Sequence, residues 1–256
     1  MIHPSAIVHP AARLGQDVSV GAYTLIGEHV EIGDGTSIGP HAVITGHTCI
    51  GARNRIFQFV SLGEAPQDKK YAGEPTRLTL GDDNVIREFC TLNTGTAQDR
   101  GETRVGDRNW IMAYVHIAHD CVVGNDTVFA NNATLAGHVQ IDDHVILGGF
   151  TGVHQFCRIG AHVITGIASV IRQDIPPFIT AAGNPVEPHG INSEGLKRRG
   201  YSADALAALK RAYKTLYKSG LTLAEAQAAI AAEAGAMPEL KPLAEFLAAS
   251  GRGIIR

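Results

Sequence analysis

The chain has 256 residues, and its 45% hydrophobic and 18% charged content is typical of a globular protein in water. No apolar run approaches the roughly 20 residues that a membrane-spanning helix needs, which argues against membrane insertion. The N-terminal stretch lacks the basic start and long apolar core of a secretory signal, and the four cysteines show no paired spacing, so we expect a cytoplasmic protein.

Charge is distributed unevenly along the chain. Residues 1–175 carry 12 Lys and Arg against 18 Asp and Glu, whereas residues 176–256 carry 10 against 7. No run of basic residues is interleaved with aromatic ones, which argues against nucleic acid as a partner. The basic C-terminal part of an otherwise acidic chain instead indicates an anionic partner.

A six-residue repeat fills the first two thirds of the chain. An aliphatic residue recurs at every sixth position in three runs: Ile2 to Leu62, Leu80 to Leu92 and Val105 to Ile171. Of these 26 hexads, 24 begin with Ile, Val or Leu, and in 13 the next residue is a glycine, which we expect to take unusual backbone angles. A period of six fits neither a long helix nor a long strand. It fits a short strand and a turn, repeated around a three-sided prism.

The repeat resembles the hexapeptide pattern of the left-handed parallel β-helix. The handedness comes from this resemblance, because parallel crossovers are usually right-handed. The fold implied is mainly β, with the first and fifth residues of each hexad inside and neighbouring coils about 4.8 Å apart. We expect this domain over residues 1–178, with two loop excursions at residues 63–79 and 96–104 where the phase breaks.

Beyond residue 178 the periodicity becomes helical, which predicts an α-helical C-terminal domain over residues 179–256. Ser202 is the expected N-cap of a helix that stops at Gly220. A capping box from Thr222 to Glu225 opens the next helix, and Pro238 begins the last one.

The hexad register also predicts which reactive side chains point outward and which point into the prism. Eleven of the twelve histidines lie in the hexad region, and none takes an inward position. Most of them, including His144 and His162 on successive coils, are expected to serve at the surface or at a contact between subunits. Three cysteines take the inward fifth position and are interpreted as packing groups: Cys90, Cys121 and Cys157.

A candidate catalytic centre surrounds His119. His119 and Asp120 occupy the turn of one hexad, and Gly137 and His138 follow one full coil of 18 residues later. An outward imidazole beside a bare glycine amide suits acyl transfer, because the base removes a proton from an alcohol while the amide stabilises the oxyanion. Asp120 would fix the imidazole tautomer and support the imidazolium.

The motifs HIAHDC, NNATLAGHV, VHQFC, EGLKRRG and GEAPQDKKYAGEPTR make the resemblance more specific. They are similar to those of the UDP-N-acetylglucosamine acyltransferases of lipid A synthesis, and the likeness spans nearly the whole chain. That family implies a homotrimer with active sites between neighbouring prisms. It also implies transfer of an (R)-3-hydroxyacyl chain from acyl carrier protein to the 3-hydroxyl of UDP-N-acetylglucosamine, with no metal and no cofactor.

The same resemblance implies roles for individual residues. His119 is the general base, Asp120 its supporting acid and Gly137 the oxyanion amide. Two residues of the first excursion would reach the sugar across the subunit boundary: Asp68 and Lys70. Four would line the nucleotide-sugar cleft: His116, His138, His154 and Gln155. Four would bind the uridine and phosphates: Asn192, Glu194, Arg198 and Arg199. For the KRR sequence in this last group, a solvated helix face is the alternative.

Ile167 marks a departure from the family pattern. Where some members have two glycines after the GAHV motif, this chain has Gly166 and then Ile167, at an outward turn position. We hypothesise that Ile167 closes the end of the acyl groove and so shortens the preferred hydroxyacyl chain. The alternative is that Ile167 packs at a contact between subunits.

Three other functions stay open at this point. A γ-class carbonic anhydrase shares the prism and would hold zinc on His116, His119 and His138. A related acyltransferase would use an amine acceptor in place of an alcohol. A scaffold without catalytic activity is the third, and it should not respond to the nucleotide sugar.

Overall fold

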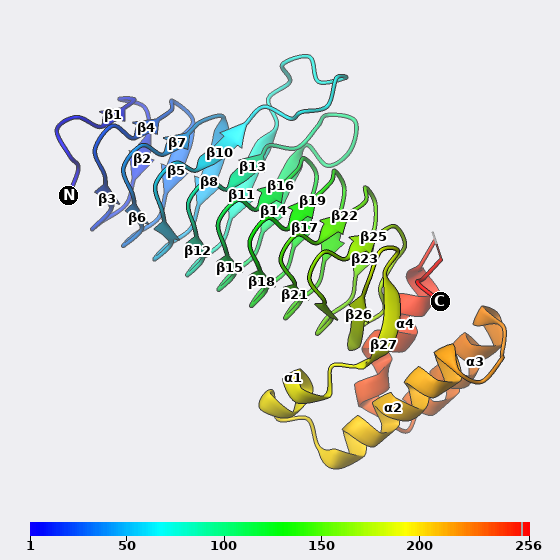
Figure 1. Ribbon diagram of the computed structural model, residues 1–256. Coiled ribbons are helices and arrows are strands. Elements are labelled where there is room, and N and C mark those ends of the chain that lie inside the picture. Colours follow the sequence, from blue (N-terminus) through cyan, green and yellow to red (C-terminus); the bar gives the residue numbers. More distant parts are fainter. Residues whose placement is uncertain (252) are drawn as a thin grey trace.

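The computed structural model describes residues 1–251 and 253–256. The chain winds into a long three-sided prism, and a group of helices packs at its C-terminal end (Figure 1). Each side of the prism is one sheet of short strands, which run parallel except for the last pair. None of the described helices is long and apolar enough to span a membrane.

The three faces take their strands in strict rotation. The first face contains β1 (Ile7–Val8), β4 (Leu25–Ile26), β7 (Val43–Ile44), β10 (Ser61–Glu64), β13 (Thr91–Asn93), β16 (His116–Ile117), β19 (Thr134–Leu135), β22 (Gly152–Val153) and β25 (Val170–Ile171). The second face contains β2 (Arg13–Leu14), β5 (Val30–Ile32), β8 (His47–Ile50), β11 (Arg77–Leu80), β14 (Glu102–Val105), β17 (Val122–Val123), β20 (Gln140–Ile141) and β23 (Arg158–Ile159). The third face contains β3 (Ser19–Val20), β6 (Ser37–Ile38), β9 (Arg55–Ile56), β12 (Val85–Ile86), β15 (Trp110–Ile111), β18 (Val128–Phe129), β21 (Ile146–Leu147), β24 (Ile164–Thr165), β26 (Ile179–Ala182) and β27 (Glu187–Ile191).

Three edges join these faces. We call the edge between the first and second faces the first edge, that between the second and third faces the second edge, and that between the third and first faces the third edge. Both long loops leave the prism at the first edge. The first loop (residues 65–76) connects β10 to β11, and the second loop (residues 94–101) connects β13 to β14.

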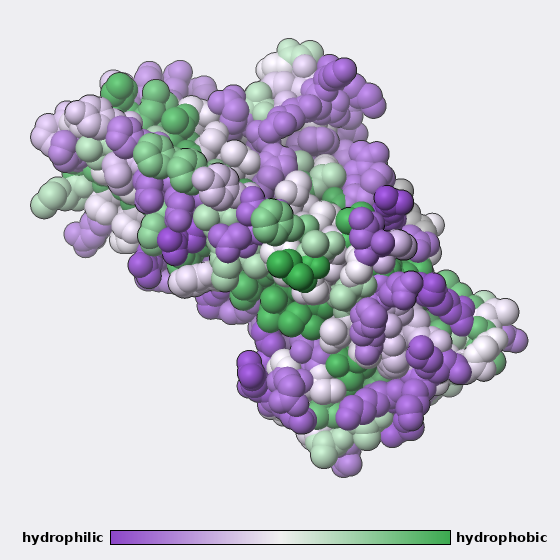
Figure 2. All heavy atoms as spheres, viewed as in Figure 1, coloured by the Kyte–Doolittle hydropathy of each residue, from purple (hydrophilic) through white to green (hydrophobic). Residues whose placement is uncertain are grey.

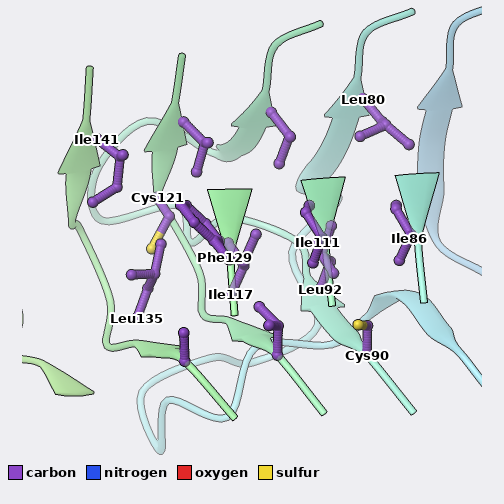
Figure 3. Packing of buried hydrophobic residues seen from close by; sticks show 14 of the residues in the cluster. Leu80, Ile86, Cys90, Leu92, Ile111, Ile117, Cys121, Phe129, Leu135 and Ile141 are labelled. Carbon is purple, nitrogen blue, oxygen red and sulfur yellow. The ribbon is translucent and has the colours of Figure 1, made fainter. Parts of the chain in front are cut away.

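The core is a stack of equivalent side chains from successive coils. Leu92 lies opposite Ile117, and Ile117 lies opposite Leu135, all on the first face and all fully buried. Figure 3 shows them meeting Ile111 and Phe129 from the third face inside the prism. The inward direction predicted for the first residue of the hexad is therefore confirmed for these coils.

The cysteines at the fifth position are buried packing groups, as predicted. Cys90, Cys121 and Cys157 form no disulfide and have no exposed surface, whereas Cys49 is exposed. Burial raises the pKa of Cys90 and that of Cys121 to about 12, so both thiols stay protonated and unreactive at neutral pH. No cysteine nucleophile is therefore available beside the histidines.

The glycines at the second position of the hexad were expected to take unusual backbone angles, and this expectation was wrong. Positive φ angles belong to the fourth residue of the hexad, which is seldom glycine; Asp120 has φ 58° and His138 has φ 65°. Glycine at the second position serves close packing between coils instead. A Cβ on Gly33, for example, would lie 2.6 Å from the carbonyl carbon of Gly51 on the next coil.

The C-terminal region closes the prism and then becomes helical. β26 pairs in parallel with β24, and β27 turns back antiparallel to β26. The helices that follow are α1 (Ser193–Arg198), α2 (Ala203–Tyr217), α3 (Leu223–Ala234), the 3-10 turn η1 (Pro238–Leu240) and α4 (Lys241–Ala249). Ser202 caps α2 through the amide of Ala205, and the capping box between Thr222 and Glu225 is present, as predicted.

Some segments differ from the sequence-based expectation. Residues 77–79 and 102–104, which were expected in loops, belong to β11 and β14. Residues 179–191 were expected in the helical part but form β26 and β27, so the first helix begins only at Ser193. The reason is that backbone pairing with the neighbouring coil extends a strand even where the six-residue pattern has lapsed.

Candidate active site

His119 lies at the first edge, in the turn between β16 and β17. Its side chain is 14% exposed, and its Nδ1 lies 2.9 Å from Oδ2 of Asp120. An imidazole that donates from Nδ1 to a carboxylate keeps the lone pair of Nε2 for another proton. The local geometry therefore presents Nε2 as a base.

Asp120 is anchored from behind by the second loop. Its side chain has no exposed surface, and it accepts hydrogen bonds from the Thr96 amide at 3.0 Å and from Thr96 Oγ1 at 2.6 Å. Burial alone raises the pKa of Asp120, but the bonds from Thr96 and His119 outweigh burial and hold the pKa below its ordinary value. Asp120 is consequently a carboxylate at neutral pH and stabilises a protonated His119.

Gly137 lies directly beyond His119 on the next coil, as the register predicted. A Cβ at Gly137 would lie 2.5 Å from Cε1 and 2.6 Å from Nε2 of His119, so only glycine leaves the imidazole in place. At the same hexad position on the second edge, the Asn125 amide donates to Asp143 Oδ1 at 2.7 Å. The Gly137 amide donates to no acceptor among the described residues, which leaves it for an oxyanion.

Two further histidines adjoin the base. His116 Nδ1 is bonded to Thr91 Oγ1 at 2.7 Å, and burial together with repulsion from His119 lowers the His116 pKa. His138 meets the His119 ring edge-on, with centroids 4.9 Å apart, and stacks on Phe156 at 4.2 Å. Its Nδ1 lies 2.6 Å from Oδ2 of Asp99.

A cavity of about 470 Å³ opens beside His138 at the first edge. Asp68 and Lys70 of the first loop line it within the same chain, so they reach this cavity without crossing to a neighbour. His154 and Gln155 are exposed on the coil that follows Gly137. A second cavity of about 460 Å³ lies beneath the first loop, near His29 and His47, and is lined by none of the predicted site residues. The cavity beside His138 is therefore the one that matches the chemistry.

The predicted uridine and phosphate residues lie at a different edge. Asn192 is the buried N-cap of α1: it accepts from the Gly195 amide and donates to the His162 carbonyl at the second edge. Glu194 is exposed and paired with Lys197, and Arg198 and Arg199 are exposed on the same short segment. One chain by itself therefore does not bring this group to His119.

Ile167 lies at the third edge and is 74% exposed, which confirms its outward direction. It flanks the first face on the side opposite to His119. Its role as a ruler stays a prediction at this stage, because the groove would have to cross that face.

Sequence reasoning missed Thr96, Thr91 and Asp99. All three contact predicted site residues. Thr96 and Asp99 lie in the second loop, where the repeat is interrupted and gives no register. Thr91 carried one usable signal, because it stands directly opposite His116 on the neighbouring coil.

Among the described residues of one chain, the three histidines of the zinc alternative do not come together. The atoms of His119, Asp120 and His138 that could bind an ion lie within 4.8 Å of one another, but His116 is not part of that group. The Nδ1 atoms of His119 and His138 are each engaged by a carboxylate.

We expect Gly137→Ala to abolish most turnover while the prism stays folded. The added methyl group would displace the His119 imidazole and crowd the free amide, and losing a base or an oxyanion donor costs on the order of 10²-fold or more. Steady-state kinetics and a thermal melt measure the two effects. Gly235→Ala, at the exposed C-terminal end of α3 with a right-handed backbone, is the control, since a Cβ there makes only an ordinary contact 3.5 Å from the Ala232 carbonyl oxygen. Equal activity of both variants would contradict the geometry.

Comparison with known proteins assigns the family. The family model described as "Udp N-acetylglucosamine O-acyltransferase; Domain 2" matches residues 174–255, and the bacterial transferase hexapeptide model matches residues 11–46 and 102–137. The acyl-[acyl-carrier-protein]–UDP-N-acetylglucosamine O-acyltransferase of Thiobacillus denitrificans is 71% identical over 100% of this chain and 99% of its own length.

Solved structures agree with this assignment. LpxA from Acinetobacter baumannii has a TM-score of 0.98 at 48% identity, covering 100% of this chain and 99% of its own. The UDP-N-acetylglucosamine acyltransferase of Francisella novicida has a TM-score of 0.98 at 41% identity, covering 100% and 94%. The fold is the left-handed parallel β-helix with C-terminal helices that the hexads predicted. The chain therefore belongs to the family of acyl-[acyl-carrier-protein]–UDP-N-acetylglucosamine O-acyltransferases.

Proposed function

We propose that His119 is the general base in the transfer of an (R)-3-hydroxyacyl chain from acyl carrier protein to the 3-hydroxyl of UDP-N-acetylglucosamine, the first step of lipid A synthesis. The reaction class rests on the family, whose members are named as O-acyltransferases, which favours an alcohol acceptor over an amine. The observation that carries the residue assignment is the His119–Asp120 pair beside the unoccupied amide of Gly137.

The proposed step needs only groups that the chain supplies. His119 Nε2 takes the proton of the sugar hydroxyl as its oxygen attacks the thioester carbonyl carbon. The resulting oxyanion accepts a hydrogen bond from the Gly137 amide, and Asp120 stabilises the imidazolium. The attack forms the C–O bond; collapse of the tetrahedral intermediate then re-forms the carbonyl and breaks the C–S bond, and His119 returns the proton to the carrier thiolate. No cofactor or metal takes part in this proposal.

The substrate contacts follow from where the cavity lies. Asp68, Lys70 and His138 line it, and His116, His154 and Gln155 lie around the same edge, so we assign these residues to the nucleotide sugar. Asn192, Glu194, Arg198 and Arg199 would bind uridine and phosphates from a neighbouring chain, because they lie at the second edge. Asn192 would act mainly by shaping α1, since its side chain is already bonded at both ends.

The distribution of apolar surface supports a homotrimer. Along the third edge the rings of Tyr23, His41, Phe59, Phe89 and Tyr114 stack with centroids about 5 Å apart, and Phe150 follows at 61% exposed. Figure 2 shows apolar residues gathered near β18 and β21 of the adjoining third face. Monomeric proteins seldom expose a large apolar patch of this kind. We therefore place the third edge against the threefold axis.

This placement completes the site. The second face carries polar outward residues such as Arg13, Glu31 and Arg104 and would point to solvent. With the third edge on the axis, the first face of one chain packs against the third face of the next. The first edge of one chain, with His119, then adjoins the second edge of its neighbour, with α1. That is the arrangement that the nucleotide sugar needs to span both groups.

The acyl carrier and the compartment follow from charge and thiol state. The exposed basic residues of the C-terminal region, Lys197, Arg198 and Arg199 among them, would attract an acidic carrier protein. None of the four cysteines forms a disulfide in the described part of the chain, which suits the reducing cytoplasm. We therefore place the reaction there.

His119→Ala tests the base. We expect turnover of hydroxyacyl carrier with UDP-N-acetylglucosamine to fall by roughly 10²- to 10⁴-fold, with a nearly unchanged melting temperature because the imidazole projects outward and is not part of the prism core. A chelator should leave the unmodified protein active. Near-normal turnover of the variant, or loss of activity with the chelator, would refute the assignment.

Ile167→Gly tests the ruler. In the trimer we propose, an acyl chain leaving His119 crosses the first face toward the third edge, where Ile167 projects. Its removal should shift selectivity toward longer hydroxyacyl chains, since each methylene that gains an apolar site is worth about 0.8 kcal/mol. A ladder of chain lengths measured by kcat/KM gives the profile. An unchanged profile would mean that Ile167 serves only the subunit contact.

A further inference from the structure

The second loop contacts both histidines at the first edge. At its start, the Thr96 amide and hydroxyl bind the Asp120 carboxylate that supports His119. Near its tip, Asp99 Oδ2 lies 2.6 Å from Nδ1 of His138. Backbone bonds from the Asp99 and Gly101 amides to the Thr96 carbonyl close the turn between these two points. The loop thus supplies the Asp99 carboxylate to His138, and it also holds the Asp120 carboxylate that contacts His119.

His138 is constrained by its backbone and by two neighbouring rings. Its backbone is left-handed, with φ 65°, and its ring lies flat on Phe156 with 5° between the planes. The His119 ring meets it at 89°. With the ring plane fixed, the remaining choice is which nitrogen faces the cavity. Asp99 decides that choice, because an ionised carboxylate accepts a hydrogen bond and cannot donate one.

Each imidazole has its own carboxylate. Asp120 Oδ2 lies 2.9 Å from His119 Nδ1 but 3.9 Å from His138 Nδ1. The other charged groups that line the cavity beside His138 are Asp68, Lys70, Arg100 and Arg158. Without Asp99, the nearest carboxylate to His138 would be Asp120, which is already bonded to Thr96 and His119.

We propose that Asp99 is a positioning residue that holds the proton on Nδ1 of His138 and so presents Nε2 to the nucleotide sugar in the cavity. The inference rests on the proposed function, in which His138 contacts that substrate. Asp99 touches no substrate itself and acts through His138. The base His119 keeps its separate partner, so Asp99 governs binding of the sugar nucleotide more than the proton transfer.

Asp99→Ala is the first test. We expect the KM for UDP-N-acetylglucosamine to rise roughly tenfold, the effect of losing one hydrogen bond to a charged group, while kcat stays within about twofold. Asp99→Asn should restore most of the affinity, because its amide oxygen still accepts from Nδ1. Glu28→Ala, which removes an exposed carboxylate elsewhere on the prism, is the control for net charge and should leave KM unchanged.

A double-mutant cycle with His138→Ala separates positioning from a general effect of the loop. In the His138→Ala background, Asp99→Ala should add no further rise in KM. An equal rise in both backgrounds, a fall in kcat with unchanged KM, or no rescue by Asp99→Asn would overturn the proposal. Turnover by the unmodified protein is measured in the same series. Its absence would refute the proposed function, whereas its presence with an additive cycle would refute the role of Asp99 alone.

Discussion

The pairing of each coil with the next, 18 residues along the chain, is the constraint on which the rest of this structure depends. Ile117 stands opposite Leu135 because backbone hydrogen bonds and a shared apolar interior allow no slip, since a shift of one residue would turn every inward side chain outward. The same register sets Gly137 beyond His119. The proposed catalytic geometry therefore follows from the register that also packs the core.

Rigidity of this kind explains how a base can sit on a turn without a supporting domain. His119 is held by Asp120, whose backbone is in the left-handed region and whose carboxylate is buried against Thr96. Such buried, fully bonded carboxylates fix an imidazole better than an exposed partner would. This arrangement makes the site depend on the second loop, which belongs to no face of the prism.

The repeat made much of this predictable. Period six fixed which residues of the hexads fill the prism, and with them the outward direction of His119 and Ile167 and the burial of Cys90. What lay outside the repeat was not predictable in the same way. Thr96 and Asp99 contact site residues through loop geometry that no periodicity encodes. The separation between α1 and His119 within one chain could not be predicted from the sequence either, because it depends on which edge of the prism the C-terminal helices pack against.

In the proposed trimer, the first edge of one chain and the second edge of its neighbour form one site. Two inactive proteins test it directly: His119→Ala, and Arg198→Ala combined with Arg199→Ala. Co-expressed at equal levels and mixed at random in trimers, they should recover about a quarter of the unmodified turnover, because one interface in four then joins two intact edges. Turnover no higher than that of either variant alone would show that the site is built within a single chain and would contradict the account.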